Sequence, residues 1–211
     1  GAGLGLAEMI ASGVTCVADM YMHTGTIAEQ ILEAGISANL SCGGVYFGAP
    51  EDFSPETCGD CRNQAALTEE WHGAGAGQIL VDASVHGEYT SNPPLWRWMA
   101  EYAAEHRLGM HVHVSETQSE HQASLERWGK TPIQALDGCG VWDCGRSLAA
   151  HCVYTTEEDW ALMAEKGISC VHNPWSNLKL GSGVAPIPAM MRAGVNVALG
   201  TDGMSSHNSA D

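Results

Sequence analysis

The sequence predicts an α/β protein in which short parallel strands alternate with helices, and three observations support this fold class. Seven short apolar runs begin near residues 14, 36, 79, 110, 147, 168 and 195. Their spacing of roughly 20 to 45 residues is typical of strand–helix units rather than hairpins. Five of the runs directly follow a helical stretch that ends in glycine, the residue that best takes the left-handed cap of a helix.

Each run is short and rich in Val and Ile, as buried parallel strands are. In chain order the runs are VTCVADM from residue 14, ISANLSC from 36, QILVDASVH from 78, MHVHVSE from 110, SLAAHCVY from 147, ISCVHN from 168 and VNVALGTDG from 195. We therefore expect seven strands, with helices in the stretches between them.

Two of these helices can be read in detail. Apolar residues recur at the spacing of one helix face in the stretch before residue 109, at Leu95, Trp98, Met99 and Tyr102. Ser91 or Asn92 is expected to cap that helix, and Thr156 to cap the helix that ends near residue 166. Trp98 and Trp160 are expected to pack against the sheet and to take no part in chemistry.

The segment from residue 43 to 77 has no clear period, apart from a helix expected around 64–71. An active-site loop and an interface loop both remain open for it. Cys58 and Cys61 form a CxxC pair, but a structural zinc site needs a second ligand pair, and none has suitable spacing. We therefore expect a surface loop with two free thiols.

Composition excludes several classes of protein. The chain has 211 residues with 45% hydrophobic and 16% charged residues, which indicates one folded domain spanning residues 1–211. The formal net charge of −16 disfavours a nucleic acid or an anionic membrane as partner. No apolar run approaches the roughly 20 residues that cross a bilayer, and the start carries no basic signal-peptide region. Cysteines inside apolar runs are typical of reduced thiols, so we expect a cytoplasmic protein.

Residues able to do chemistry stand at the ends of the apolar runs. They are His86, His113, Glu116, His151, His172, Asn173 and Asp202. Because ligands bind at the carboxyl ends of strands in parallel α/β folds, these residues are expected to share one site. Imidazole and carboxylate groups suit zinc, whose bound water can reach a pKa near 7. The pattern predicts metal-assisted hydrolysis, although any one of these residues alone could be structural.

Several stretches together resemble the amidohydrolase superfamily. They are LAEMIASGVTCVADMY, HVSET, AAHCVY, VHNPWSNLKLGSG and NVALGTDGMSSHNS. The resemblance is strongest to methylthioadenosine/S-adenosylhomocysteine deaminases and their guanine-deaminase and chlorohydrolase relatives. It implies a (β/α)8 TIM-type barrel, one divalent metal ion per subunit (zinc as a rule, Fe²⁺ or another as alternatives) and a small-molecule substrate of the aminopurine nucleoside type.

The resemblance also implies roles for five residues. His113 and Asp202 would bind the metal, and Asp202 would take the proton of the attacking water. Glu116 would carry that proton to a ring nitrogen of the substrate, and would thus both bind substrate and act in catalysis. His151 would hydrogen-bond the attacking water, and His86 would contact substrate.

This sequence departs from the family pattern in three respects. The HxH ligand pair expected after the first barrel strand is absent, so we expect strands two to eight of an incomplete barrel, without strand one and without the C-terminal part. His111 and His113 form another HxH, in which His111 is expected to lie one layer deeper. SVHGEYT replaces the commoner PHxPYT pattern, and His207 stands where Asn is usual. We expect a fragment that is inactive alone, and a homo-oligomer of the full-length protein stays open.

Three other functions remain as alternatives. A guanine deaminase or an s-triazine chlorohydrolase would keep the superfamily and change the leaving group. A non-catalytic binding relative is disfavoured by Glu116 and Asp202, because a binder has little use for a proton shuttle. A doubly wound α/β protein is disfavoured because no GxGxxG or phosphate loop follows a strand.

Overall fold

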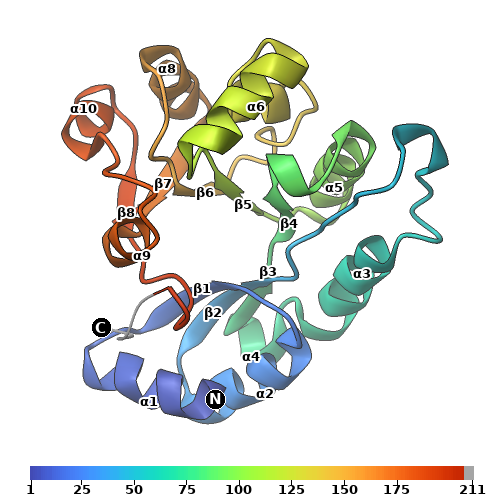
Figure 1. Cartoon of the computed structure of the whole chain (residues 1–211). Coiled ribbons are helices and arrows are strands. Elements are labelled where there is room, and N and C mark those ends of the chain that lie inside the picture. Colours follow the sequence, from blue (N-terminus) through green and yellow to red (C-terminus); the bar gives the residue numbers. More distant parts are fainter. Residues whose placement is uncertain (207–211) are drawn as a thin grey trace.

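The computed structural model describes residues 1–206 as strands that alternate with helices (Figure 1). The strands are β1 (Cys16–Met20), β2 (Ser37–Ser41), β3 (Ile79–Val81), β4 (Ala83–Gly87), β5 (Met110–Val114), β6 (Ser147–His151), β7 (Ile168–His172) and β8 (Val197–Leu199). The helices are α1 (Ala2–Ala11), α2 (Thr24–Ala34), α3 (Gly59–Trp71), α4 (Ala74–Gly77), α5 (Pro93–His106), α6 (Gln118–Trp128), α7 (Pro132–Asp137), α8 (Glu157–Lys166), α9 (Pro174–Lys179) and α10 (Ile187–Arg192). Two short 3₁₀ turns are η1 (Pro50–Asp52) and η2 (Glu88–Thr90). His207 lies outside the described residues.

The strand pairs are all parallel, which confirms the predicted α/β class. One ladder has the order β1-β2-β3 and the other has the order β4-β5-β6-β7-β8. The register of the second ladder sets His113 opposite Ala150 and Val114 opposite His151. The carboxyl ends of neighbouring strands therefore lie at one level.

Asp82 divides the strand that the sequence presents as a single run from 79 to 86. Its N–H donates to the Leu40 carbonyl at 2.9 Å, and the N–H of Ala83 donates to the Gly109 carbonyl at 2.9 Å. The chain thus passes from one ladder to the other at this residue, and the ladders form one curved sheet. The buried Asp82 carboxylate accepts the Gly109 N–H and pairs with Arg146.

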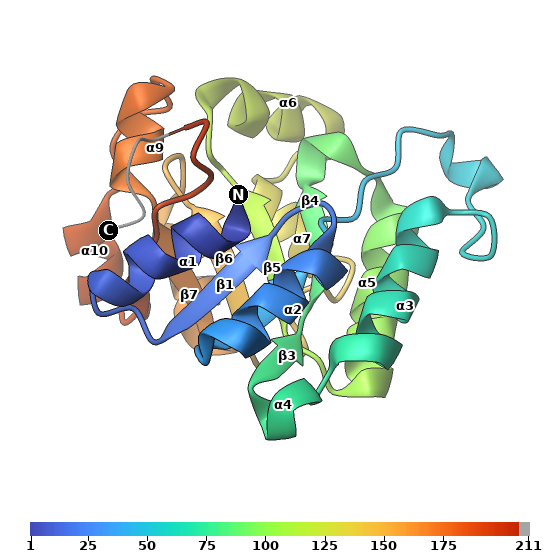
Figure 2. The same ribbon diagram turned by 90° about the horizontal axis from the view of Figure 1, so that it is seen from below.

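The curved sheet is an incomplete barrel with helices on its outside (Figures 1 and 2). β1 and β8 are its two edges, and no ladder joins them within residues 1–206. The incomplete barrel agrees with the fold that the resemblance implies.

Two apolar clusters hold the helices on the sheet. The larger cluster packs α5, α7 and α8 against the second ladder and contains fully buried Leu95, Trp96 and Met99. The smaller cluster packs α1 and α2 against the first ladder and contains Ile31 and Leu40. Burial of such side chains is the main force that stabilises strand–helix layers.

The helix predictions hold, with one correction at the start of α5. Trp98 and Trp160 are half-buried and pack on the larger cluster, as expected. Thr156 caps α8, accepting the N–H of Asp159. Asn92 stands at the cap position of α5, but its side-chain amide donates to the Gly48 carbonyl at 2.9 Å and does not cap the helix.

The CxxC pair does not lie in a surface loop, which corrects the sequence expectation. Helix α3 begins at Gly59, earlier than residue 64, so Cys58 is its cap and Cys61 lies in its first turn. Both thiols are free, buried and part of the larger apolar cluster. No helix in the described part of the chain is long and apolar enough to cross a membrane.

Candidate active site

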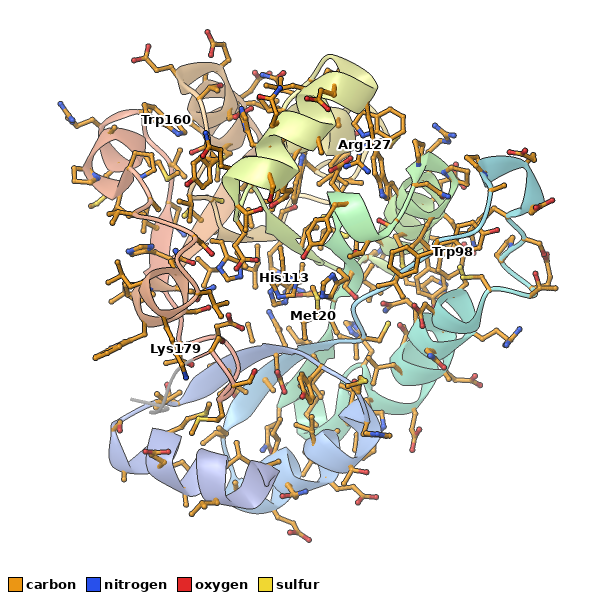
Figure 3. The ribbon with its side chains drawn as sticks, in the orientation of Figure 1. Met20, Trp98, His113, Arg127, Trp160 and Lys179 are labelled. Carbon is orange, nitrogen blue, oxygen red and sulfur yellow. The ribbon has the colours of Figure 1, made fainter. Side chains whose placement is uncertain are left out.

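The structure gathers the strand-end residues at the mouth of the barrel. The His113 ring lies 5.1 Å from the His86 ring and 5.6 Å from the His151 ring, measured between centroids. The Glu116 Oε2 atom lies 3.9 Å from the His151 Nε2 atom. Figure 3 shows the His113 side chain in the middle of the ring of strands. Side chains from β4, β5 and β6 thus meet as the sequence predicts.

His113 is oriented by a single backbone bond. Its Nδ1 lies 2.8 Å from the His86 carbonyl oxygen, so Nδ1 carries the proton and donates. The Nε2 lone pair is therefore available as a metal ligand. Burial, together with the smaller effects of the neighbouring His151 and His86, lowers the pKa of His113 to about 4. The imidazole is consequently neutral at neutral pH, which is the form that binds metal.

His151 receives a comparable constraint from α9. Its Nδ1 lies 2.8 Å from the Asn177 Oδ1 atom, an acceptor, so Nδ1 donates and Nε2 faces Glu116. His151 is 2% exposed and has a φ of 75°, a backbone conformation that is strained in a non-glycine residue. The strained backbone and the buried hydrogen bond together fix the direction of the ring.

His86 presents its Nε2 atom in the same way. The Thr90 hydroxyl donates to the Gly87 carbonyl at 3.1 Å, so its oxygen accepts from His86 Nδ1 at 3.1 Å. Burial lowers the pKa of His86, while the charge of Glu116 opposes that shift. In His86, His113 and His151 the Nδ1 atom thus makes a hydrogen bond, which leaves Nε2 as the ring nitrogen available to the mouth.

Asp202 follows β8 and is an ionised carboxylate. Ser176 and Ser206 donate their hydroxyls to its Oδ2 at 2.5 and 3.0 Å, and the Gly203 N–H donates to its Oδ1 at 2.6 Å. Burial on its own would raise the pKa of Asp202, but these hydrogen bonds outweigh it and the pKa is lowered. A carboxylate held charged can bind a metal or accept a proton.

Two other predicted positions lie close by with different environments. His111 is buried one layer deeper, its Nδ1 lying 3.4 Å from the Ser41 hydroxyl, and burial lowers its pKa to about 3. The Nδ1 atom of His172 is buried and has no hydrogen-bond partner among the described residues, and burial lowers the pKa of this ring. Asn173 is 4% exposed and stands at the cap position of α9 without a side-chain capping bond, and its amide nitrogen lies 3.5 Å from His151 Nδ1.

The chemical types of the donors fit a divalent metal such as zinc. Neutral imidazole nitrogen and ionised carboxylate oxygen are both zinc ligands, and His113 and Asp202 supply one of each. Within residues 1–206, no group of three or more His, Cys, Asp or Glu side chains is arranged to hold an ion.

Sequence reasoning missed the residues that orient the site. Asn177 positions His151, Ser176 holds Asp202, Thr90 orients His86, and the Ser182 hydroxyl donates to Glu116 at 3.3 Å. Three of these four residues come from the WSNLKLGSG stretch. This stretch resembles the family pattern, but the resemblance does not say which side chain each of its residues contacts. Its polar residues directly after a strand end were the available signal.

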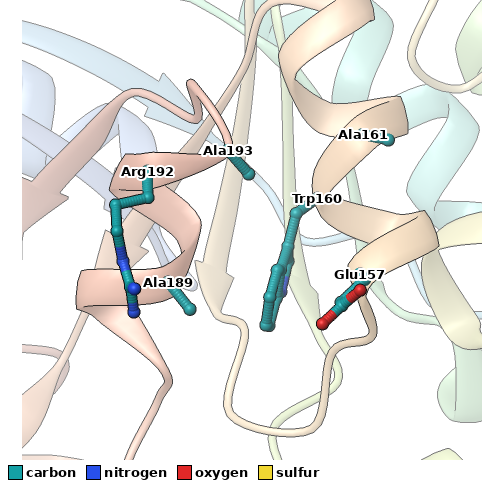
Figure 4. A pocket seen from close by; sticks show the side chains of 6 residues that line it. All are labelled: Glu157, Trp160, Ala161, Ala189, Arg192 and Ala193. Atoms are coloured by element: carbon teal, nitrogen blue, oxygen red, sulfur yellow. The ribbon is translucent and has the colours of Figure 1, made fainter.

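A hollow on the outer surface is separate from this mouth. It lies between α8 and α10 and has a volume of about 440 Å³ (Figure 4). The residues that line it are Glu157, Trp160, Ala161, Ala189, Arg192 and Ala193. None of the strand-end residues contributes to it, so it is not part of the candidate active site.

Comparison with known proteins gives one consistent family. The model of the amidohydrolase family matches residues 1–211. The chain is 43% identical over 213 residues to a 5-methylthioadenosine/S-adenosylhomocysteine deaminase of Moorella thermoacetica, covering 100% of this chain and 48% of the relative. It is 40% identical over 211 residues to a protein of the same name from Halothermothrix orenii, covering 100% of this chain and 47% of that one. The chain thus spans about half the length of the curated relatives it matches.

Solved structures agree on the fold. An adenosine deaminase from Xanthomonas campestris with bound zinc superimposes with a TM-score of 0.88 at 31% identity, over 100% of this chain and 47% of that one. A guanine deaminase from C. acetobutylicum with bound guanine gives 0.86 at 22% identity, over 99% and 51%. An atrazine chlorohydrolase from Arthrobacter aurescens TC1 with zinc gives 0.84 at 22% identity, over 99% and 50%. The last two likenesses concern the fold alone.

Proposed function

Because the chain belongs to the amidohydrolase family, we propose that it supplies the barrel mouth of a zinc-dependent hydrolytic deaminase. The observation that carries this proposal is the set of histidine rings from β4, β5 and β6 that meet at one mouth beside Glu116, with the ionised Asp202 following β8. Such a set combines metal ligands with proton-transfer groups. The proposal applies to the complete polypeptide that contains this chain.

His113 and Asp202 would hold the metal, through Nε2 and a carboxylate oxygen. A zinc ion bound there supplies Lewis acidity and lowers the pKa of water toward 7. His113 suits this role because the His86 carbonyl fixes its proton on Nδ1. Asp202 suits it because two hydroxyls and one N–H keep its carboxylate charged. The two residues would supply two of the three protein ligands usual in catalytic zinc sites.

The other residues would move protons and orient the reactants. Asp202 accepts the proton of the attacking water, and His151 accepts a hydrogen bond from that water at Nε2. Glu116 transfers the proton to a ring nitrogen of the substrate, which makes the amino-bearing carbon more electrophilic. His86 binds substrate through its Nε2 lone pair. Attack at that carbon gives a tetrahedral intermediate. Its new hydroxyl group gives up the second proton of the water to the amino group, so the C–N bond breaks, ammonia leaves and the C–O bond becomes a carbonyl.

We propose an aminopurine nucleoside as the substrate. This choice rests on the two relatives named 5-methylthioadenosine/S-adenosylhomocysteine deaminase, at 43% and 40% identity, and on the adenosine deaminase structure at 31% identity. Guanine and s-triazine substrates have only the shared fold in their favour. The eight cysteines are free, which is compatible with the reducing cytoplasm we propose as the compartment.

A substrate panel tests the proposal on the complete polypeptide. The protein is stripped of metal with a chelator, reloaded with zinc and assayed for ammonia release from adenosine, 5′-methylthioadenosine, S-adenosylhomocysteine and guanine. Chloride release from atrazine is assayed alongside. We expect ammonia from an aminopurine nucleoside only in the zinc-loaded protein. Zinc-loaded protein that releases no ammonia from any aminopurine nucleoside would contradict the proposed function.

The 211-residue chain expressed alone serves as a second test. We expect it to release no ammonia, because His113 and Asp202 are fewer ligands than a catalytic zinc site uses. Turnover by this chain alone would show that two ligands are enough.

A further inference from the structure

One buried carboxylate holds the turn that carries Glu116. Glu120 lies in the first turn of α6 and is 5% exposed. Its Oε1 accepts the Ser115 N–H at 2.7 Å, and its Oε2 accepts the Glu116 N–H at 2.7 Å and the Thr117 N–H at 3.4 Å. Three consecutive backbone amides between β5 and α6 therefore converge on one side chain.

This turn has a backbone that needs support. Ser115 has a φ of 53°, in the left-handed region that a non-glycine residue adopts at an energetic cost. Ser115 is fully buried, so without Glu120 its N–H would lose its partner away from water. The bonds from Glu120 thus offset both the strain and the burial of the amide.

The other capping boxes of the chain show that Glu120 does more than cap a helix. In α8 the Asp159 carboxylate accepts the N–H of the cap residue Thr156, and in α7 Gln134 does the same for Thr131. A capping box consists of two reciprocal hydrogen bonds between the cap residue and the third helical residue, and nothing more. Glu120 makes its bond to the cap and also reaches two residues further back, to Ser115 and Glu116.

We propose that Glu120 is a positioning residue for the deaminase reaction and acts through Glu116. By fixing the Ser115–Glu116 backbone, it sets the Glu116 carboxylate 3.9 Å from His151 Nε2 and within 3.3 Å of the Ser182 hydroxyl. The hydrogen bonds of Glu120 go to residues 115–117 and to neither of the proposed metal ligands. The inference rests on the proposed function, because it assigns Glu116 the proton transfer.

Shortening the side chain separates the two tasks of Glu120. Glu120→Asp keeps a carboxyl group that can still bond the cap amide, as Asp159 does in α8, but it is too short to reach Ser115. Thr117→Ala is the matched control, because it removes the cap hydroxyl that accepts the Glu120 N–H at 3.1 Å and leaves the carboxylate bonds in place. Both variants are made in the zinc-loaded complete polypeptide.

We expect Glu120→Asp to lower kcat by roughly tenfold to a hundredfold, because a small misplacement of a catalytic group costs that much. KM is expected to stay within about threefold, as for an interaction made only in the transition state. The pH profile of kcat should change, since the environment of Glu116 changes. Thr117→Ala should lower Tm and keep kcat within about twofold. An unchanged kcat and pH profile in Glu120→Asp, or an equal loss of kcat in both variants, would overturn the proposal.

Amide hydrogen exchange examines the same turn without turnover. The Ser115 and Glu116 amides are expected to exchange roughly tenfold or more faster in Glu120→Asp than in the wild type or in Thr117→Ala. Equal protection of these two amides in all three proteins would refute the role of Glu120. Wild-type protein without deaminase activity would refute the proposed function instead, so the two failures are distinguishable.

Discussion

The charge on Glu120 should make stability depend on pH in a way that one substitution removes. Burial raises the pKa of the Glu120 carboxyl from its ordinary value of 4.5 to about 7, although three backbone N–H groups favour the charged form. Between these two values the folded chain holds a proton that the unfolded chain has already lost. The contribution of Glu120 to stability is therefore fully present below pH 4.5 and is lost as the pH rises through 7.

The size of this effect follows from the two pKa values. Each pH unit between them corresponds to about 1.4 kcal/mol, so the whole shift amounts to about 3 kcal/mol in the free energy of unfolding. Glu120→Gln has no proton to lose and resembles the protonated carboxyl in shape. The free energy of unfolding of the wild type, minus that of Glu120→Gln, should fall by about 3 kcal/mol between pH 4.5 and 8.

Urea unfolding followed by circular dichroism at several pH values measures this difference. Glu126→Gln removes an exposed carboxylate from the same helix and is the matched control for the loss of one negative charge. A difference between wild type and Glu120→Gln that stays constant within about 1 kcal/mol from pH 4.5 to 8 would refute burial as the dominant influence on Glu120.

Three further predictions concern other parts of the molecule. His113→Asn should lower the amount of zinc bound by the complete polypeptide, measured by atomic emission. The same substitution at the exposed His106 should leave the bound zinc unchanged, and equal zinc in both variants would exclude His113 as a ligand. Asn177→Ala should lower kcat by roughly tenfold to a hundredfold, because His151 loses the partner that orients its ring. Asn177→Asp keeps a hydrogen-bond acceptor for His151 and should keep most of the rate, so equal kcat values in the two variants would contradict this prediction. Leu95→Ala should lower the free energy of unfolding by about 2 to 5 kcal/mol, because the side chain is fully buried. A loss under about 1 kcal/mol in urea unfolding would show instead that the neighbouring side chains move in to fill the cavity.

The strand pattern was predictable because each strand is marked by residues that are close together in the sequence. A glycine with positive φ precedes β1, β2 and β7, at Gly13, Gly35 and Gly167, and the short Val- and Ile-rich runs follow. The break at Asp82 was not predictable, because it depends on which neighbour each half of the run pairs with. Pairing of that kind is a tertiary property and leaves no periodic signal.

The positions of the strand-end residues in the candidate site were predictable, and the orientation of their side chains was not. His86, His113 and His151 could be expected at one mouth because parallel strands end at one level. Their tautomers are set by the His86 carbonyl, Thr90 and Asn177, and these partners follow from the fold. Glu120 carried an available signal, since Thr117 and Glu120 have the capping-box spacing.

Four residues that follow or end strands near the barrel mouth have a left-handed backbone: Ser115, His151, Cys152 and Asp202. Each is a position where glycine would relieve about 1 to 3 kcal/mol of strain. A mutant library sorted only for heat resistance would therefore favour glycine at His151 and Asp202 and discard two side chains on which turnover would depend. Directed evolution of this barrel needs a selection for activity in every round, because selection for thermal stability alone favours variants without catalytic side chains.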